Sequence, residues 1–481
     1  MDISLISKYD RPVPRYTSYP TAPHFHAGIG PADYVRWLQE CDAGQPLSLY
    51  LHVPYCRQMC WYCGCHTKIV ARQEPIDRFV ETLRAEIDLI ADILAASGPR
   101  RRVSQIHWGG GTPNVMLPVQ FADLMEHIGH RFDLEAGTVR AVELDPRWIT
   151  RDWLTALQLA GINRASLGVQ DFDPTVQTAI NRVQSFELVR GAVAGLREAG
   201  IGSINLDLLY GLPHQTLETL ARTVDLAVAL GPDRISLFGY AHVPWMKSHQ
   251  KQIDESALPD AALRWQLQEQ AATQLHRRGY RSIGFDHFAR PDDDLALALE
   301  HGRLQRNFQG YTTDDSDILI GFGPSAIGSL PAGYVQNAVA TADWQRAISE
   351  RRTAVSRGIA LTAEDRARRD IINALMCDGH VNLAAIRDRH PEVWIDYTTD
   401  LERLRLLLAD GLVEMTGNDI RLTELGRPLM RVVAACFDHY LHPDTDRIDP
   451  AMAEQAKPHT AHPDTAPTHT GRVVGRYSRV I

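Results

Sequence analysis

The sequence lacks an excess of basic residues, a long hydrophobic run and a secretion signal. Its 481 residues carry 50 Lys and Arg against 59 Asp and Glu, and the net charge of −9 argues against general nucleic-acid binding. No run of about 18 apolar residues occurs, so we predict no membrane span. The first residues do not follow the charged-then-apolar pattern of a signal peptide. We therefore expect a cytoplasmic protein with no nucleic-acid partner and no membrane partner.

Cysteine is also scarce, yet four of the seven cysteines lie within ten residues in YCRQMCWYCGC. In a reducing compartment, clustered cysteines bind metal or react more often than they form disulfides. Cys56, Cys60 and Cys63 can surround one centre, and three thiolates on a cubane iron–sulfur cluster leave one iron without a protein ligand. Zinc is the alternative, although structural zinc sites usually add a second ligand pair after a longer loop. Cys65 is a fourth ligand, a bystander or a separate functional residue.

Short apolar runs alternate with amphipathic stretches from residue 48 onward. This alternation predicts parallel strands joined by crossover helices. The regular spacing favours a barrel over a doubly wound sheet, so the predicted fold is α/β, a partial (β/α)6 TIM-like barrel. The predicted strands are residues 48–54, 103–109, 139–145, 164–170, 203–211 and 234–241.

Polar or small residues lie at or just after the end of each predicted strand. The carboxyl ends of barrel strands form one rim, and this rim holds the active site in such folds. We therefore expect these residues to meet at one rim, together with the cysteine loop. They are Gly110, Gly111, Thr112, Glu143, Gln170, Asp207 and Ala241.

Changes in the pattern set the predicted domain boundaries. Residues 1–45 show no clear period and are predicted to form an N-terminal arm, and residues 46–255 the barrel. Residues 256–355 are predicted to extend the barrel and to form the substrate-site region. Residues 356–440 are mostly helical with a two-stranded wing, typical of a winged-helix-like lid domain, in which acidic residues outnumber arginines. Residues 441–481 are predicted to be a flexible tail ending in YSRVI.

The motifs, taken in order, resemble one family of the radical S-adenosylmethionine (SAM) superfamily. CxxxCxxC after the first barrel strand resembles the cluster loop of that superfamily. With PRYTSYPTA, HWGGGTP, VELDPR, DLLYGLPHQT and GRLQRNFQGYTTD, it resembles the oxygen-independent coproporphyrinogen III oxidases (dehydrogenases). The resemblance covers roughly residues 8 to 440 and the final YSRVI.

The resemblance implies an enzyme of haem (porphyrin) biosynthesis. The implied reaction oxidatively decarboxylates two propionates of coproporphyrinogen III to vinyl groups, giving protoporphyrinogen IX by means of a 5′-deoxyadenosyl radical. An electron donor and a terminal electron acceptor are implied but not identified, and we expect a monomer. The alternative is a related radical SAM haem chaperone or haem-degrading enzyme; Cys65, the PRYTSYP arm and NFQGYTT favour the oxidase. A DNA-binding redox regulator is disfavoured by the acidic C-terminal region.

The resemblance also implies a set of site residues. A [4Fe–4S] cluster is expected on Cys56, Cys60 and Cys63, with two bound SAM molecules. The first SAM is assigned to Tyr50, Gly110, Glu143 and Ile327. The second is assigned to Tyr62, Gly111, Thr112, Gln170, Arg182, Asp207 and Ala241. Tyr50, Glu143 and Cys65 are expected to take part in catalysis.

The residue types suit these roles. Glycine lets the backbone approach a ligand closely, Glu143 can accept from an ammonium group, and Arg182 can pair with a carboxylate. The sequence departs from the family pattern at Tyr62, where Phe is usual, and at His66, where Asn is usual. The substrate carries four carboxylates, and the candidate cations for it are Arg15, Lys68, Arg303 and Arg306. The last two are three residues apart and could share a helical face.

Overall fold

The structure, a computed structural model, describes residues 5, 8–441, 477 and 478. The chain divides into two compact units, one of Met1–Pro23 with Thr362–Val480 and one of His24–Leu361 with Ile481. Nearly all of the predicted tail, residues 441–481, lies outside the described residues. Each unit is considered by itself below.

The larger unit contains all six strands that the apolar runs predict. Each pairs in parallel with the next in the chain. The aliphatic residues of β1, Leu47, Leu49, Leu51 and Val53, alternate along the strand and are buried on one face, while Ser48, Tyr50 and His52 occupy the other. These strands are β1 (Leu47–Val53), β4 (Arg102–Gly110), β5 (Asp133–Leu144), β6 (Arg164–Gln170), β7 (Ser203–Tyr210) and β8 (Arg234–Gly239).

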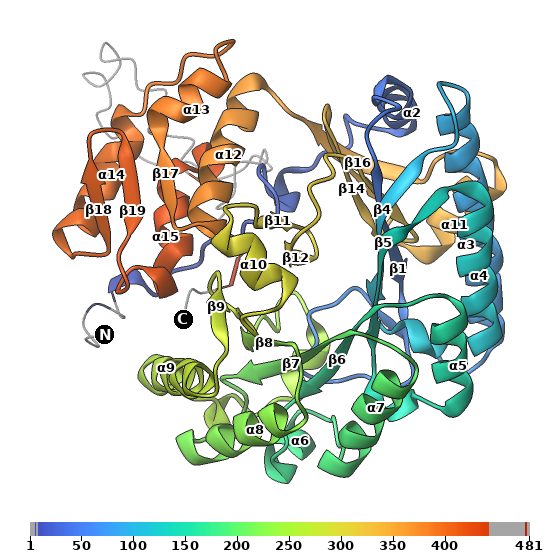
Figure 1. The fold of residues 1–481 in the computed structure, drawn as a ribbon, viewed down its shortest axis with the longest axis horizontal. Helices are drawn as coiled ribbons and strands as arrows, with labels where there is room; N and C mark the ends of the chain where they lie inside the picture. Colours follow the sequence, from blue (N-terminus) through green and yellow to red (C-terminus); the bar gives the residue numbers. More distant parts are fainter. Residues whose placement is uncertain (1–4, 6–7, 442–476, 479–481) are drawn as a thin grey trace, which may run out of the picture. The chain divides into compact units, whose positions relative to one another are not determined.

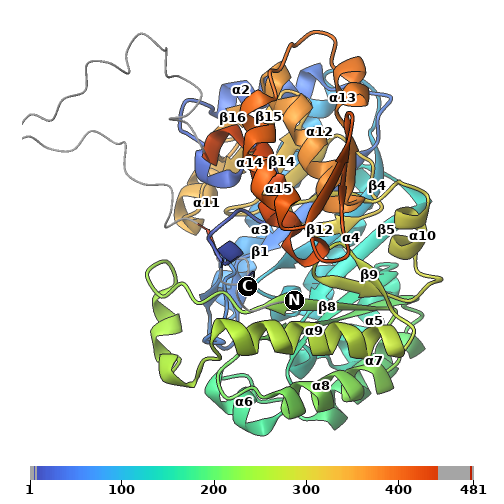
Figure 2. The ribbon, with the colours of Figure 1, turned by 90° about the vertical axis from the view of Figure 1, so that its left-hand side faces the viewer.

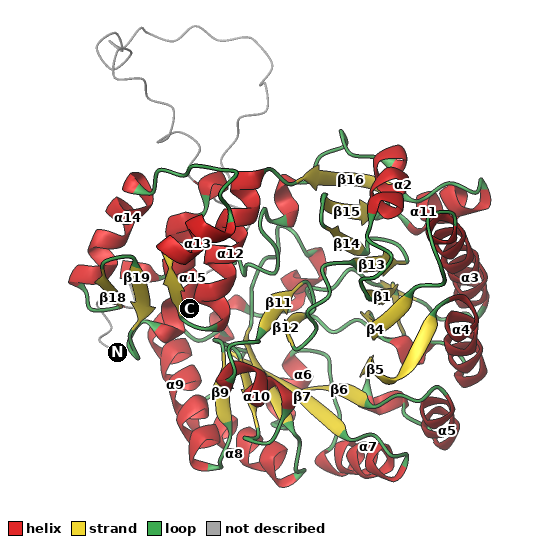
Figure 3. Cartoon of the chain, turned by 45° about the horizontal axis from the view of Figure 1, so that its top comes forward, coloured by secondary structure: helices red, strands yellow, loops and turns green. Residues whose placement is uncertain are grey.

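The sheet continues beyond these strands at both edges. Next to β1, the parallel strand β13 (Leu319–Phe322) is followed by the antiparallel strands β14 (Ile327–Leu330), β15 (Gly333–Asn337) and β16 (Val355–Ala360), in the order visible in Figure 3. Next to β8 come β10 (His287–Ala289) and β9 (Arg281–Ile283), both antiparallel. Within the described residues, the sheet therefore has twelve strands. Separate short pairs are β2 (Tyr55–Cys56) with β3 (Lys68–Ile69), and β11 (Gln305–Asn307) with β12 (Gly310–Thr312).

Helices cover the outer face of the curved sheet (Figure 1). Several begin at a Ser or Thr whose side chain accepts from a backbone N–H of the first turn, as Thr150, Ser185 and Thr216 do. Figure 2 shows two of these helices, α8 and α9, side by side. The helices are α3 (Glu74–Ala95), α4 (Pro118–Arg131), α5 (Arg151–Leu159), α6 (Pro174–Ala179), α7 (Phe186–Glu198), α8 (Leu217–Ala229), α9 (Ala261–Arg277), α10 (Asp294–Glu300) and α11 (Thr341–Ser349).

The predicted N-terminal arm contains a helix that the sequence analysis missed. Helix α2 (Pro31–Glu40) buries Tyr34, Trp37 and Leu38, which lie at the i, i+3 and i+4 positions of one helical face. It packs against α3 and β16. The helical spacing of its apolar residues extends over only ten residues, and the prolines and glycines around it made the helix hard to recognise in the sequence.

The smaller unit has the predicted winged-helix type of fold. Its strands β17 (His380–Asn382), β18 (Val413–Thr416) and β19 (Asp419–Leu422) form a sheet in the order β17-β19-β18. Its helices are α12 (Ala363–Cys377), α13 (Leu383–Arg389), α14 (Thr398–Ala409) and α15 (Met430–Ala434). The predicted two-stranded wing is β18 and β19, and the three-residue β17 was not foreseen. Within the described residues of both units, no helix combines the length and apolar character needed to cross a bilayer.

A buried carboxylate connects α3 to the turn between β13 and β14. Glu86 Oε2 accepts from the backbone N–H of Gly323 (2.7 Å), and Oε1 accepts from Asn337 Nδ2 (2.8 Å). Burial raises the pKa of Glu86 to about 7. The folded protein therefore holds this proton at pH values where the unfolded chain has released it.

Replacing Glu86 should change how stability depends on pH. Because the folded pKa lies above the unfolded value, Glu86 makes the unfolding free energy fall as pH rises from about 4.5 to 7. Relative to Glu86→Gln, the wild-type unfolding free energy should fall by about 3 kcal/mol across this window. Urea denaturation of both proteins at pH 4.5 and pH 8 measures the difference. If the two proteins differed in unfolding free energy by the same amount at both pH values, the raised pKa of Glu86 would be contradicted.

Candidate active site

The cysteine loop leaves β1 at the carboxyl edge of the sheet. All four cysteines are free thiols; Cys60 is buried, Cys56 and Cys63 are half-buried, and Cys65 is exposed. Cys63 N donates to the Cys60 carbonyl (3.1 Å), which curls the loop. Burial raises the pKa of Cys56 to about 12, against the hydrogen bond that its sulfur accepts from Thr67 Oγ1 (3.3 Å).

The donor set fits a cubane cluster better than a single ion. Within the part of the chain that the structure describes, no three His, Cys, Asp or Glu side chains are placed to coordinate one metal ion. A cubane binds each thiolate to a different iron, so its ligands lie farther apart than the ligands of one zinc ion. Three neighbouring thiols without a fourth protein ligand therefore match a cubane cluster.

Side chains from the segment after β8 hold the second half of the loop. This segment includes the 3-10 helix η4 (Ser248–Gln252), and its polar side chains donate to backbone carbonyls of the loop. The bonds are Gln250 Nε2 to Tyr62 O (3.0 Å), His249 Nε2 to Cys63 O (2.8 Å) and Lys247 Nζ to Cys65 O (3.0 Å). Gln250 Nε2 also donates to the Ala241 carbonyl (3.2 Å), which brings Tyr62 and Ala241 together.

A different segment holds the first half of the loop. Asn181 Nδ2 donates to the Met59 carbonyl (2.7 Å), and Asn181 Oδ1 accepts from Gln58 Nε2 (3.2 Å). Trp61 N donates to the Ile180 carbonyl (3.0 Å). The loop is therefore fixed from two sides by the connections that follow β6 and β8.

The structure brings together the residues predicted for the first SAM. Glu143 Oε2 accepts from Gly110 N (3.3 Å), and its Oε1 accepts from His107 Nε2 (2.9 Å). Gly110 has a φ of +109°, which explains the glycine. Tyr50 pairs across the sheet with His107 of β4 and with Gly321 of β13. Ile327 begins β14, which is antiparallel to β13, and its carbonyl lies beside Gly321, the residue that pairs with Tyr50.

His52 fixes the Tyr50 hydroxyl. His52 Nε2 donates to the His66 carbonyl (2.9 Å), so Nδ1 accepts from Tyr50 Oη (3.1 Å) in the neutral ring. Burial lowers the pKa of His52, which favours this neutral form. The His66 ring donates to the Val339 carbonyl (3.0 Å). His66, which stands where the family usually has Asn, therefore connects the end of the cysteine loop to the backbone at Val339.

Of the residues predicted for the second SAM, Gln170 and Asp207 lie on the neighbouring strands β6 and β7, and Gly111 and Thr112 directly follow β4. Thr112 N donates to the Tyr55 carbonyl (2.9 Å), and a Cβ on Gly111 would lie 2.4 Å from the same oxygen, so no larger residue fits there. Gln170 has a φ of +70°, a rare conformation for a residue other than glycine, and follows a bulge opposite Asp207.

Glu143 and Asp207 line one cavity of about 240 Å³ inside the barrel. Asp207 accepts from Ser166 Oγ (3.0 Å) and Asn205 Nδ2 (2.7 Å). Burial, and after it the charge of Glu143, raise the pKa of Asp207. The two carboxylates therefore face a shared space, although the resemblance assigns them to different SAM molecules.

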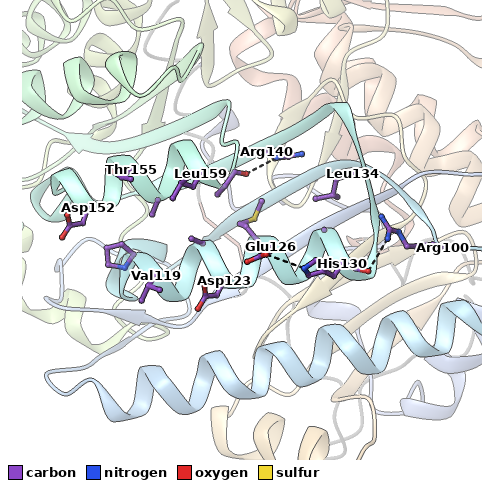
Figure 4. Close-up of a pocket in the computed structure, with 16 residues that line it drawn as sticks. Arg100, Val119, Asp123, Glu126, His130, Leu134, Arg140, Asp152, Thr155 and Leu159 are labelled. Carbon is purple, nitrogen blue, oxygen red and sulfur yellow. Dashed lines mark hydrogen bonds and ion pairs between the residues drawn. The ribbon is translucent and has the colours of Figure 1, made fainter.

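A larger cavity of about 800 Å³ lies elsewhere, on the outer surface between α4 and α5 (Figure 4). Figure 4 shows Val119 and Leu159 on the two helices that flank it. None of the residues predicted for the site lines this cavity. If the site were chosen by cavity volume alone, the choice would therefore fall on this outer cavity and not on the ends of the strands.

The candidate arginines for the substrate differ from the expectation. Arg306 lies in β11, and Arg303 lies in the irregular segment before it, so they do not share a helical face. Arg306 is buried over the rings of Tyr311 and Phe285, at 4.4 and 5.1 Å from the ring centres. The spacing of three residues was therefore wrongly interpreted as helical.

Several residues around the site were missed. Lys247, His249 and Gln250 carry no recognisable motif. His107 and Arg147 lie within HWGGGTP and VELDPR, the quoted motifs, but received no role. For His107 and Arg147, the only signal in the sequence was that they lie next to residues that had been assigned to the site.

Comparisons with known proteins agree with this geometry. Residues 50–227 match the radical SAM superfamily, and residues 361–429 match the HemN C-terminal domain. The chain is 50% identical to an oxygen-independent coproporphyrinogen III oxidase of Bradyrhizobium diazoefficiens, over 91% of this chain and 97% of that protein. It is 44% identical to the protein of the same name from Paracoccus denitrificans, over 90% and 95%. A solved structure of coproporphyrinogen III oxidase (HemN) from Escherichia coli, described as a radical SAM enzyme, matches with a TM-score of 0.86 and 39% identity, over 92% of this chain and 99% of that chain.

The fold and the three-cysteine loop are those of the radical SAM class. Within this class, the chain belongs to the oxygen-independent coproporphyrinogen III oxidase family. The resemblance stated from the motifs is thus confirmed, and so is the predicted fold class. The superfamily uses a [4Fe–4S] cluster and SAM, as expected; a second SAM molecule and the individual site residues stay predictions.

Gln250→Ala should weaken the cluster loop. The change leaves the partly buried Tyr62 and Ala241 carbonyls without this donor, and a net hydrogen bond contributes about 0.5–1.5 kcal/mol. After anaerobic reconstitution, we expect less iron per chain and faster iron loss to a chelator. The matched control is Gln252→Ala, because Gln252 is exposed on the same helix. Equal iron retention by the two variants would contradict the role of Gln250.

Proposed function

We propose that the protein oxidatively decarboxylates coproporphyrinogen III to protoporphyrinogen IX without oxygen, in haem biosynthesis. The observation that carries this proposal is the near-complete match to relatives of that name, up to 50% identical over 97% of their length. The cysteine loop at the strand ends supplies the matching site. The names of these relatives favour the oxidase over the haem chaperone or haem-degrading alternative.

Cys56, Cys60 and Cys63 would hold a [4Fe–4S] cluster and leave one iron free for SAM. When bound, the cluster and SAM would supply the abstraction of a hydrogen atom from each reacting propionate side chain. The chain itself would position SAM and exclude water. In the proposed arrangement, Glu143 accepts from the SAM ammonium group, and Tyr50 and Ile327 line the same SAM.

The second SAM is proposed to contact the residues around Gly111, Gln170 and Asp207. Arg182 is the residue proposed to meet its carboxylate. Its Nη2 donates to the Gly168 carbonyl (2.6 Å), and its buried Nε has no hydrogen-bond partner among the described residues. That Nε is the donor most open to a new acceptor.

Other parts of the proposal concern partners. A one-electron donor of low potential would reduce the cluster, and a terminal acceptor would take the electron released with each carbon dioxide. The protein would act as a cytoplasmic monomer. Within the larger unit, Lys68 and Arg303 are exposed and Arg306 is stacked on aromatic rings, so Lys68 and Arg303 are the stronger candidates for the substrate carboxylates.

An anaerobic assay tests the proposed function. The reconstituted protein, SAM, a reductant and coproporphyrinogen III are incubated with cell extract as the source of the electron acceptor, and porphyrins are followed by mass. We expect the loss of two carbon dioxide units, and no such loss with Cys60→Ala, which lacks one proposed cluster ligand. SAM cleavage with unchanged substrate would keep a radical enzyme but contradict the substrate, and haem would be tested next.

A further inference from the structure

Two arginines and one aspartate form a buried ionic cluster beside the cysteine loop. Arg147 belongs to the 3-10 helix η3 (Pro146–Trp148), which follows β5, and Arg182 belongs to the connection between α6 and α7. Both meet the carboxylate of Asp145. The side chains of Arg147, Asp145 and Arg182 are only 9%, 8% and 8% exposed.

Asp145 orients Arg147 through two hydrogen bonds along one edge of the guanidinium group. Arg147 Nε donates to Asp145 Oδ1 (3.0 Å), and Nη2 donates to Oδ2 (2.7 Å). This fork-to-fork geometry holds the planar group in one orientation. Asp145 is itself fixed, because its backbone N–H donates to Thr112 Oγ1 (3.1 Å) and its carbonyl accepts from Asn114 Nδ2 (2.9 Å).

The oriented guanidinium groups reach the cysteine loop. Arg182 Nη1 lies 3.4 Å from Cys60 Sγ, and Arg147 Nη2 lies 3.9 Å from the same sulfur. Arg147 Nη1 also donates to Gln58 Oε1 (3.0 Å), two residues before Cys60. Two guanidinium groups therefore contact the sulfur of Cys60, one of the three proposed cluster ligands.

The charges of the three groups leave one net positive charge at Cys60. Two guanidinium groups outnumber the single carboxylate, and burial limits screening by solvent. Hydrogen bonds to cluster sulfurs and nearby positive charge both stabilise the reduced form, which carries one more negative charge. Removing one cation should therefore make reduction of the cluster harder.

We propose that Arg147, held by Asp145, raises the reduction potential of the cluster bound at Cys60. This inference rests on the cluster of the proposed function, but not on its substrate. Arg147 is a positioning residue, since it acts through the Cys60 sulfur and the Gln58 side chain. Its role differs from that of Arg182, which is also a candidate for SAM.

The test is a redox titration of the reconstituted cluster, followed by electron paramagnetic resonance. In Arg147→Gln, the ratio of reduced to oxidised cluster at a fixed potential should fall about tenfold, which is a shift of about 59 mV to lower potential for a one-electron couple. Iron and sulfide contents are measured in each sample. An unchanged midpoint in a fully loaded variant would overturn the proposal.

Arg57→Gln is the matched control. It removes the same charge from the residue next to Cys56, but Arg57 is exposed and lies over the Trp148 ring. Solvent screens its charge, so we expect a clearly smaller shift than in Arg147→Gln. Equal shifts in the two variants would show that total charge matters instead of the buried contact, and would overturn the proposal.

Arg147→Lys provides a second test in case Arg147→Gln does not incorporate the cluster. Lysine keeps a positive charge near Asp145 but lacks the fork that reaches Cys60 Sγ. We expect a shift in the same direction, smaller than that of the Gln variant, and an unchanged or raised midpoint would overturn the proposal. If the wild-type protein forms no cluster, the proposed function fails instead, so the two failures are distinct.

Discussion

The segment from Cys56 to Cys65 has little secondary structure, so the direction of its thiols depends on contacts with other segments. Backbone polar groups that find no partner destabilise a fold. Here side chains after β8 satisfy the carbonyls of Tyr62, Cys63 and Cys65, and Asn181 satisfies that of Met59. The loop can therefore present three sulfurs in a fixed arrangement before any cluster binds, which is the preorganisation that a reactive cofactor needs.

The sheet supplies the rigid base for this arrangement. Strands β1, β4 and β5 end side by side, so Glu143 contacts both His107 and Gly110 of the neighbouring strand. Glu143 and Asp207 line the cavity in the barrel, and burial raises the pKa of Asp207. Asp145, by contrast, sits between two guanidinium groups, and the balance of these contacts lowers its pKa. The site thus separates an acidic barrel interior from a cationic side facing Cys60.

The sequence predicted the barrel well because the parallel strands carry buried apolar residues at alternate positions, as in β1, β6 and β7. It failed where the signal was short or ambiguous: α2 is ten residues long, β17 has three residues, and the spacing of Arg303 and Arg306 fits a helix although Arg306 lies in a strand. The contacts of Lys247, His249 and Gln250 could not be foreseen. They join residues more than 180 positions apart, and their acceptors are backbone carbonyls, which leave no trace in the sequence.

The central claim is that three thiolates of this loop hold a four-iron cluster and leave one iron open. Mössbauer spectroscopy of the ⁵⁷Fe-reconstituted protein, with and without SAM, tests it most directly. We predict four irons per chain, with one iron in four changing its isomer shift when SAM is added, because only the iron without a thiolate can take new ligands. A spectrum that does not respond to SAM, or four irons that stay equivalent, would contradict this account of the loop.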